Sequence, residues 1–186
     1  FVLGTKADTL ERLRPLVRKS VIGEQVNFTV SEWQEDKHGV INRIGEKFGE
    51  QDLAVRSSSS AEDTWSNSNA GSFTSLLDVP GNDADRLEAS INQVAASYSQ
   101  GIGADQVLVQ RMVKGVVRHG VVLTRTLNHG APYYTLNFDD SASGSTESVT
   151  SGHGEDLRTV VIHRSATESR IAVDPRVSPI LQAVLE

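Results

Sequence analysis

An arginine followed by four serines is the part of this sequence whose residue types most directly suggest chemistry. An apolar run at 52–56 predicts a short strand that ends in Arg56, and a stretch rich in serine, asparagine and glycine follows at 57–72. The planar guanidinium group suits phosphate oxygens, and small residues allow backbone amides to approach an anion closely. A low-complexity linker has the same composition. The residues alone therefore leave phosphate binding and a plain linker both open.

This stretch matches none of the common phosphate-binding or hydrolytic loops. It lacks the Gly-Lys-Ser/Thr ending of a Walker A loop and the Gly-x-Gly-x-x-Gly pattern of dinucleotide-binding folds. Its serines also lack the Gly-x-Ser-x-Gly context of a nucleophile elbow, which argues against a serine hydrolase.

The same stretch resembles the signature of the pyruvate phosphate dikinase and phosphoenolpyruvate synthase family. The V-R-S-S, E-D and A-G elements of that signature stand here as Val55–Ser58, Glu62–Asp63 and Ala70–Gly71. The resemblance implies that Arg56 contacts the phosphates of ATP and that Ser58 and Gly71 belong to the nucleotide site. It also implies that the Ser59–Gly71 loop closes over the phosphates as a lid.

The N-terminus carries a second match. Leu3–Ala7, followed by two spaced leucines, is similar to the family's G-G-K-A start, with Thr5 in place of the second glycine. The resemblance implies that Lys6 meets the nucleotide phosphates. Without the resemblance, Lys6 is a solvated lysine at the start of a helix.

A third match concerns adenine. Val107–Val113 resembles the family's V-x-V-Q-x-M-V strand, beside which the linker holds the adenine ring. An adenine slot needs apolar faces with backbone donors and acceptors for the ring edge. The resemblance implies that Gln110, Met112 and Val113 form this slot, whereas the pattern alone predicts only a buried strand with Gln110 at an edge.

The second half of the chain departs from the family pattern. Gly120–Arg125 is similar to the family's S-G-V-x-F-T strand, but His119 replaces the serine and the usual Asp-Pro is absent. The carboxylates of Asp139, Asp140 and Glu147 suit Mg²⁺, with a solvated turn as the alternative. This half looks closer to a divergent branch of the family.

The five histidines are scattered without metal-binding spacing. Thr150–His153 superficially resembles the family's phosphate-carrying histidine motif, but no A-x-x-A-R helix follows it. The family's phosphohistidine resides in a separate downstream domain. We therefore assign no residue of this chain as a metal ligand or a phosphohistidine.

Hydrophobic spacing predicts helices in the first half and antiparallel strands in the second. A helix is expected at 5–19, with a capping box from Thr5 to Asp8 and a break at Pro15. A second helix is expected at 32–48, with Ser31 as N-cap and Gly49 as stop. A third is expected at 83–98. Strands are expected at 26–30, 52–56, 73–79, 106–113, 116–125, 133–139, 156–164 and 169–173. Hairpin connections are expected at Lys114–Gly115 and Asn128–Gly130. A last helix is expected from Pro175.

These elements predict an α+β (α/β) fold, and the resemblance makes it an ATP-grasp-like nucleotide-binding domain. We expect an N-terminal part with the phosphate loop at 1–105 and a β-rich ATP-grasp lobe at 106–186. The net charge of −6 and the lack of a basic stripe argue against nucleic-acid binding. The absence of cysteine, of a signal peptide and of a run of about 18 apolar residues favours a cytoplasmic protein without a membrane span.

The resemblance implies the ATP-binding part of a dikinase-type phosphotransferase, with ATP and Mg²⁺ as cofactors. The family uses ATP to phosphorylate a mobile histidine and then passes the phosphoryl group to pyruvate. The implied partners are the phosphohistidine and phosphoenolpyruvate/pyruvate domains of the full-length protein. Lys6 and Arg56 are the catalytic candidates, because positioning and charge neutralisation dominate phosphoryl transfer.

Two other functions stay open. The departures at Thr5 and His119 favour a degenerate, non-catalytic or partner-binding ATP-grasp module, and a carbohydrate dikinase would share the same nucleotide chemistry. The chain starts at Phe1 and stops within an expected helix, so we expect a piece of a longer protein. The family's metal-binding glutamate and Q-x-R-P motif lie beyond such a helix, so we expect this piece alone not to catalyse phosphoryl transfer.

Overall fold

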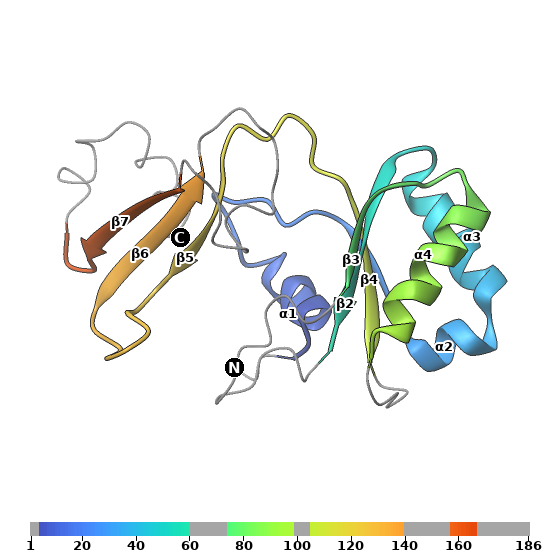
Figure 1. Ribbon diagram of the computed structural model, residues 1–186, viewed down its shortest axis with the longest axis horizontal. Coiled ribbons are helices and arrows are strands. Elements are labelled where there is room, and N and C mark those ends of the chain that lie inside the picture. The colour runs from blue at the N-terminus through green and yellow to red at the C-terminus, as the bar shows by residue number, and fades with distance from the viewer. Residues whose placement is uncertain (1–3, 60–73, 99–104, 140–156, 167–186) are drawn as a thin grey trace. The chain divides into compact units, whose positions relative to one another are not determined.

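The computed structural model describes residues 4–59, 74–98, 105–139 and 157–166, whose elements fall into two compact units (Figure 1). The first unit comprises Phe1–Val17 and Val21–Val113, and the second comprises Arg18–Ser20 and Lys114–Glu186. Each unit contains one antiparallel sheet, and the described helices belong to the first unit. The fold is therefore α+β, as predicted.

The first unit contains a four-stranded sheet in the order β1-β4-β2-β3. Its strands are β1 (Gln25–Thr29), β2 (Asp52–Ser58), β3 (Ser75–Pro80) and β4 (Gln106–Arg111). All three strand pairs are antiparallel. β4 lies between β1 and β2, and the compact unit extends to Val113.

Within the described residues of this unit, four helices accompany the sheet. They are α1 (Lys6–Leu13), α2 (Val30–Glu35), α3 (Lys37–Phe48) and α4 (Ala84–Ala96). In Figure 1, α1 lies on one side of the sheet and α2, α3 and α4 lie on the other.

The prediction of one continuous helix at 32–48 was wrong. Asp36 separates α2 from α3, because its backbone leaves the helical region at φ −144° and ψ 68° and its carboxylate accepts the Gly39 amide at 2.8 Å. The N-cap of α2 is Thr29 rather than Ser31. The stop at Gly49 is confirmed, with φ at 58°. The expected break at Pro15 is also consistent with the end of α1 at Leu13.

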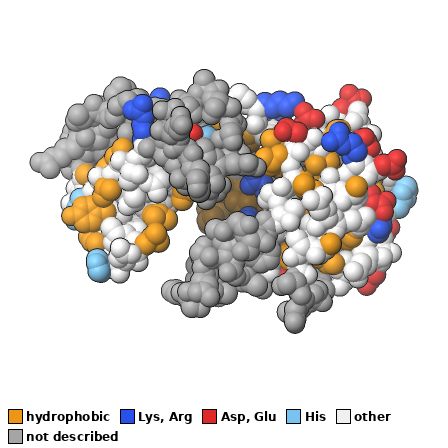
Figure 2. Space-filling view, viewed as in Figure 1, with side chains coloured by type: hydrophobic (Ala, Val, Ile, Leu, Met, Phe, Trp, Pro, Cys, Tyr) orange, Lys and Arg blue, Asp and Glu red, His pale blue; other side chains and the backbone are white. Residues whose placement is uncertain are grey.

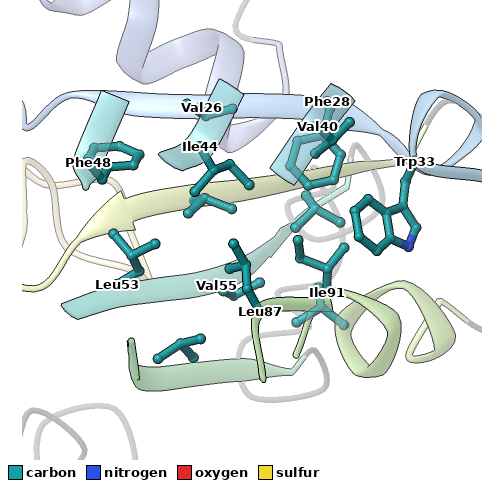
Figure 3. Packing of buried hydrophobic residues seen from close by; sticks show 14 residues of the cluster. Val26, Phe28, Trp33, Val40, Ile44, Phe48, Leu53, Val55, Leu87 and Ile91 are labelled. Atoms are coloured by element: carbon teal, nitrogen blue, oxygen red, sulfur yellow. The ribbon is translucent and has the colours of Figure 1, made fainter. Parts of the chain in front are cut away.

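The core of the first unit lies between the sheet and helices α2, α3 and α4 (Figure 3). Apolar residues alternate along the strands and recur at helical spacing, so one face of each element is apolar. The buried cluster comprises Val26, Phe28, Trp33, Val40, Ile44, Phe48, Leu53, Val55, Val79, Leu87, Ile91, Val94, Val107 and Val109.

The second unit contains the three-stranded sheet β5-β6-β7. Its strands are β5 (His119–Leu123), β6 (Tyr133–Asp139) and β7 (Leu157–His163), and both pairs are antiparallel. One face is built on buried Tyr134, Leu136 and Phe138. Hydrophobic side chains also gather on the visible surface of this unit (Figure 2).

Two predicted connections have different outcomes. The hairpin at Asn128–Gly130 is confirmed, because it lies between the paired strands β5 and β6. The hairpin predicted at Lys114–Gly115 was wrong, because β4 pairs with β1 and β2, whereas β5 pairs with β6 in the other sheet. The strand expected at 169–173 and the helix expected from Pro175 lie outside the described residues. None of the described helices has the length and apolar character needed to cross a bilayer.

Candidate functional site

One face of the four-stranded sheet carries three of the residues expected to bind nucleotide, Arg56, Ser58 and Gln110. Val55, Val107 and their neighbours of the same parity point into the core, so the intervening residues point to the opposite face. We call this the α1 face, and it comprises Gln25, Asn27, Ala54, Arg56, Ser58, Gln106, Leu108 and Gln110. Its composition is largely polar, in contrast to the apolar core face.

The strand register arranges the α1 face in three rows. Ser58 lies opposite Gln106, Arg56 opposite Leu108, and Ala54 opposite Gln110. Gln110 in turn lies opposite Gln25 of β1. Residues facing each other in an antiparallel pair have Cβ atoms about 5 Å apart, so the two side chains of each row lie close together. Ala54, Leu108 and Ser58 are buried, whereas Arg56, Gln106 and Gln110 are partly exposed.

Near its start, the backbone of helix α1 is held on this face by hydrogen bonds with side chains of the sheet. The Ala7 amide donates to Oγ of Ser58 at 2.9 Å, and Nε2 of Gln25 donates to the Ala7 carbonyl oxygen at 2.9 Å. Ala7 itself is completely buried. The first turn of α1 is therefore attached to both β1 and β2.

The N-cap of α1 is attached to β4 as well. The predicted capping box is confirmed: Oγ1 of Thr5 accepts the Asp8 amide at 3.3 Å, and the Asp8 carboxylate accepts the Thr5 amide at 3.3 Å. The Thr5 hydroxyl also donates to Oε1 of Gln106 at 2.7 Å. Nε2 of Gln106 lies 3.4 Å from the Asp8 carboxylate. Threonine at this position thus performs a capping role that glycine has no side chain to perform.

Lys6 is the first residue of α1 and is exposed. Its two sequence neighbours, Thr5 and Ala7, are both bonded to the sheet. The amino end of a helix carries partial positive charge, and lysine adds a full charge there. The same turn holds the Asp8 carboxylate, and the amides of Ala7 and Asp8 are already engaged, so Lys6 supplies the positive side-chain charge of this turn.

Arg56 lies in the middle row of the α1 face and is half-buried. Its Nε atom is buried and has no hydrogen-bond partner within the described parts of the chain. Buried polar atoms are nearly always paired in folded proteins, and each exception needs an explanation. A guanidinium donor of this kind suits a phosphate oxygen.

The expected adenine residues lie at the other end of β4. Gln110 is half-buried on the α1 face. The backbone amide of Met112 donates to the carbonyl oxygen of Asp52 at 2.8 Å, so this donor is already engaged within the sheet. Val113 is 74% exposed, which leaves an apolar side chain at the surface beyond the strand.

Two further residues were expected to contact the nucleotide, and only Ser58 lies within the described residues. Ser58 is completely buried, and its Oγ accepts the Ala7 amide, so its hydroxyl faces α1 rather than open solvent. Gly71 and most of the expected lid lie outside the described residues.

The amino-acid sequence matches the model of the family described as pyruvate phosphate dikinase, AMP/ATP-binding domain, over residues 5–178. This chain belongs to that family. None of the curated proteins matches the sequence. Family membership confirms the resemblance found in the motifs and implies ATP or AMP binding. The roles of individual residues such as Lys6 and Arg56 stay predictions.

The second unit contains residues at which the sequence differs from the family pattern, and two of them lie next to each other. His119 and Asp139 are register partners on β5 and β6, with Nε2 and Oδ2 4.0 Å apart. Asp139 is only 2% exposed, so the expectation of a solvated turn at this residue was wrong. Asp140 and Glu147 lie outside the described residues. Within the described ranges, no group of three histidine, aspartate or glutamate side chains is arranged to hold a metal ion.

The sequence did not reveal several residues that build the site. Gln25 and Gln106 bond to the start of helix α1, and Tyr98 bonds to Ser58 and Gln106 at the ends of β2 and β4. The alternation of polar residues along β1 and β4 was a usable signal for the two glutamines, because polar side chains on a strand mark the face away from the core. For Tyr98, no pattern in the sequence identified its partners.

Proposed function

We propose that this chain binds ATP on the α1 face and positions the phosphates for transfer to a histidine of a separate domain. The observation that carries the proposal is the buried Nε of Arg56, which has no hydrogen-bond partner among the described residues and lies one row from the anchored start of α1. A phosphate oxygen would satisfy this donor and would also be stabilised by the Lys6 charge.

The order of rows on the α1 face supports this orientation of the nucleotide. Arg56 lies opposite Leu108, and Met112 follows four residues further along the chain. Four residues of extended chain cover about 13 Å, which leaves room for ribose between phosphates at Arg56 and adenine at Met112 and Val113. Gln110, in the intervening row, faces the same side.

In this proposal the residues act by position and charge. Lys6 and Arg56 neutralise charge on the transferred phosphoryl group, which is the main contribution of a protein to this chemistry. Gln110, Met112 and Val113 hold the adenosine part. Mg²⁺, bound to the phosphate oxygens, would add further neutralisation.

The wider activity follows from the family. We propose a dikinase-type phosphotransferase in the cytoplasm, with an ATP-grasp-like arrangement of the nucleotide domain. The phosphohistidine and phosphoenolpyruvate/pyruvate domains of the full-length protein would receive the phosphoryl group in turn.

The proposal is tested by calorimetric titration of Mg-ATP into the chain and into Arg56→Ala. Loss of a charge-assisted hydrogen bond costs about 1.5–3 kcal/mol, so we expect the substitution to weaken binding by roughly 10- to 150-fold. Arg111→Ala is the matched control, because Arg111 lies on β4 with the parity of the core-facing valines. Equal affinities for the wild type and Arg56→Ala would refute the role of Arg56, and absence of ATP binding by the wild type would refute the function.

A further inference from the structure

Tyr98 connects the ends of the two strands that carry the candidate phosphate site. It follows α4 by two residues and is 8% exposed. Its hydroxyl accepts a hydrogen bond from the Ser58 amide at 3.0 Å and donates to the carbonyl oxygen of Gln106. Because Ser58 and Gln106 are register partners, a single phenol oxygen joins β2 to β4 where both reach the site.

The same two residues hold the start of α1. Ser58 accepts the Ala7 amide through Oγ, and Gln106 accepts the Thr5 hydroxyl through Oε1. A series of hydrogen bonds therefore links Thr5 to Gln106, Gln106 to Tyr98, Tyr98 to Ser58, and Ser58 to Ala7. We call this series the circuit. Lys6 is the one residue between the two ends of this circuit.

We propose that Tyr98 is a positioning residue of the nucleotide site. By fixing the ends of β2 and β4, its hydroxyl sets the start of α1, and with it Lys6, relative to Arg56 on β2. Groups held in place before the ligand arrives bind it more tightly, because less ordering is needed on binding. This inference rests on the proposed function and adds a residue that contacts no nucleotide atom.

The role of Ser58 follows from the same circuit. Its amide and its hydroxyl are both engaged within the protein, and its side chain is completely buried. Ser58 therefore transmits the position of Tyr98 to α1 rather than binding phosphate itself.

Tyr98→Phe tests the proposal, because it removes one oxygen and keeps the buried ring. The affinities of the variant for ATP and for adenosine, each with Mg²⁺, are measured by titration and compared with those of the wild type. Loss of a neutral hydrogen bond corresponds to roughly a three- to tenfold weakening. We expect ATP to bind about three- to tenfold more weakly and adenosine to be unchanged within about twofold. Tyr134→Phe, a similarly buried tyrosine of the second unit, is the control.

The selectivity for phosphate separates positioning from a general loss of structure. A variant that is merely less well folded would lose affinity for ATP and adenosine by the same factor, and that result would overturn the proposal. Unchanged ATP affinity would overturn it as well. If the wild type failed to bind ATP, the proposed function would fail first, and the role of Tyr98 with it.

A second measurement keeps the proposal falsifiable if Tyr98→Phe folds poorly. Ser58→Ala breaks the same circuit at its contact with Ala7, and it should reproduce the selective loss of ATP affinity. In both variants the Ala7 amide should exchange its hydrogen faster than in the wild type, while the amide of Val40 in α3 keeps its rate. Unchanged exchange at Ala7 would show that the circuit does not hold α1.

Discussion

The side-chain nitrogen of Gln25 donates a 2.9 Å hydrogen bond to the carbonyl oxygen of Ala7 and so joins the first strand to the first helix. This bond fixes the orientation of the amide, since a carbonyl oxygen can only accept. The other side-chain atom of Gln25, Oε1, is buried and has no hydrogen-bond partner within the described residues. Gln25 thus carries one contact that stabilises α1 and one unsatisfied acceptor.

Replacement of Gln25 by methionine should destabilise the first unit only modestly. The Ala7 carbonyl would lose its donor, at a cost of about 1–3 kcal/mol, whereas removal of the unpaired Oε1 offsets part of that loss. We expect a net destabilisation of about 1 kcal/mol, measured by urea unfolding with tryptophan fluorescence. Both tryptophans, Trp33 and Trp65, fall within the sequence of the first unit. Gln93→Met, at an exposed position of α4, should change stability by less than about 0.5 kcal/mol; equal effects of the two changes would contradict the prediction.

Two glycines, Gly45 inside α3 and Gly49 directly after it, should respond to alanine with opposite signs. Gly49 has φ 58° and ψ −129°, a conformation that residues with a Cβ rarely adopt, so Gly49→Ala should cost about 1–3 kcal/mol. Gly45 lies inside the helix, and a Cβ there would meet open space. Gly45→Ala should therefore stabilise the first unit by about 0.5–1 kcal/mol. The same urea experiment measures both, and a gain from Gly49→Ala would show that the C-cap conformation is not required.

The local features of the fold were predictable because they depend on neighbouring residues. The capping box at Thr5 and Asp8, the stop at Gly49 and the period-two strands follow from short sequence patterns. The break at Asp36 was missed because apolar residues at Trp33 and Val40 continue the helical spacing across it. Only the backbone conformation of Asp36 reveals that its carboxylate caps a new helix.

The charged residues of the candidate site are a prediction from sequence motifs, whereas its hydrogen-bonded framework could not be predicted. Arg56 and Lys6 stand in motifs that identify the family. The framework depends on the strand order β1-β4-β2-β3. That order brings Ser58 to Ala7, 51 residues away, and Tyr98 to Ser58, 40 residues away. Nothing in the local sequence specifies that order, because long-range pairing is decided by packing of the whole unit.

The ion pair between Lys37 and Glu88 should make a pH-dependent contribution to stability. Their atoms lie 2.8 Å apart, and the hydrogen bond and charge of Lys37 hold the pKa of Glu88 below its ordinary value. A carboxyl with a lowered folded pKa stabilises the protein above its unfolded pKa, about 4.3 for glutamate, and loses that contribution as the pH falls through the lower folded value. Glu88→Gln should therefore lower the Tm at pH 7 and have no effect well below about pH 4.

Salt provides the control for this ion pair. Both side chains are partly exposed, so about 1 M NaCl should remove most of the difference between wild type and Glu88→Gln at pH 7. Glu46→Gln, an exposed glutamate of α3, should leave the Tm nearly unchanged under the same conditions. A difference for Glu88→Gln that persists at acid pH would indicate that packing, rather than charge, is responsible.

Thr5 stands where the family motif has glycine, and substitutions at this position measure what its hydroxyl contributes to the stability of the first unit. Its hydroxyl accepts the Asp8 amide and donates to Gln106, so Thr5→Ala removes an N-cap and a side-chain contact together. We expect Thr5→Ala to destabilise the first unit by about 1–2 kcal/mol. Thr5→Ser keeps the hydroxyl and should stay within about 0.5 kcal/mol of wild type.

Thr5→Gly completes this series with the residue found in the family motif. Glycine is a tolerable N-cap and costs only a few tenths of a kcal/mol in that role, so the remaining loss measures the contact with Gln106. Unfolding in urea should therefore place Thr5→Gly between the serine and alanine variants. If serine proved as harmful as alanine, the hydroxyl of Thr5 would not be the source of the stability, and the attachment of α1 to β4 would have to rest on the other contacts of Gln106.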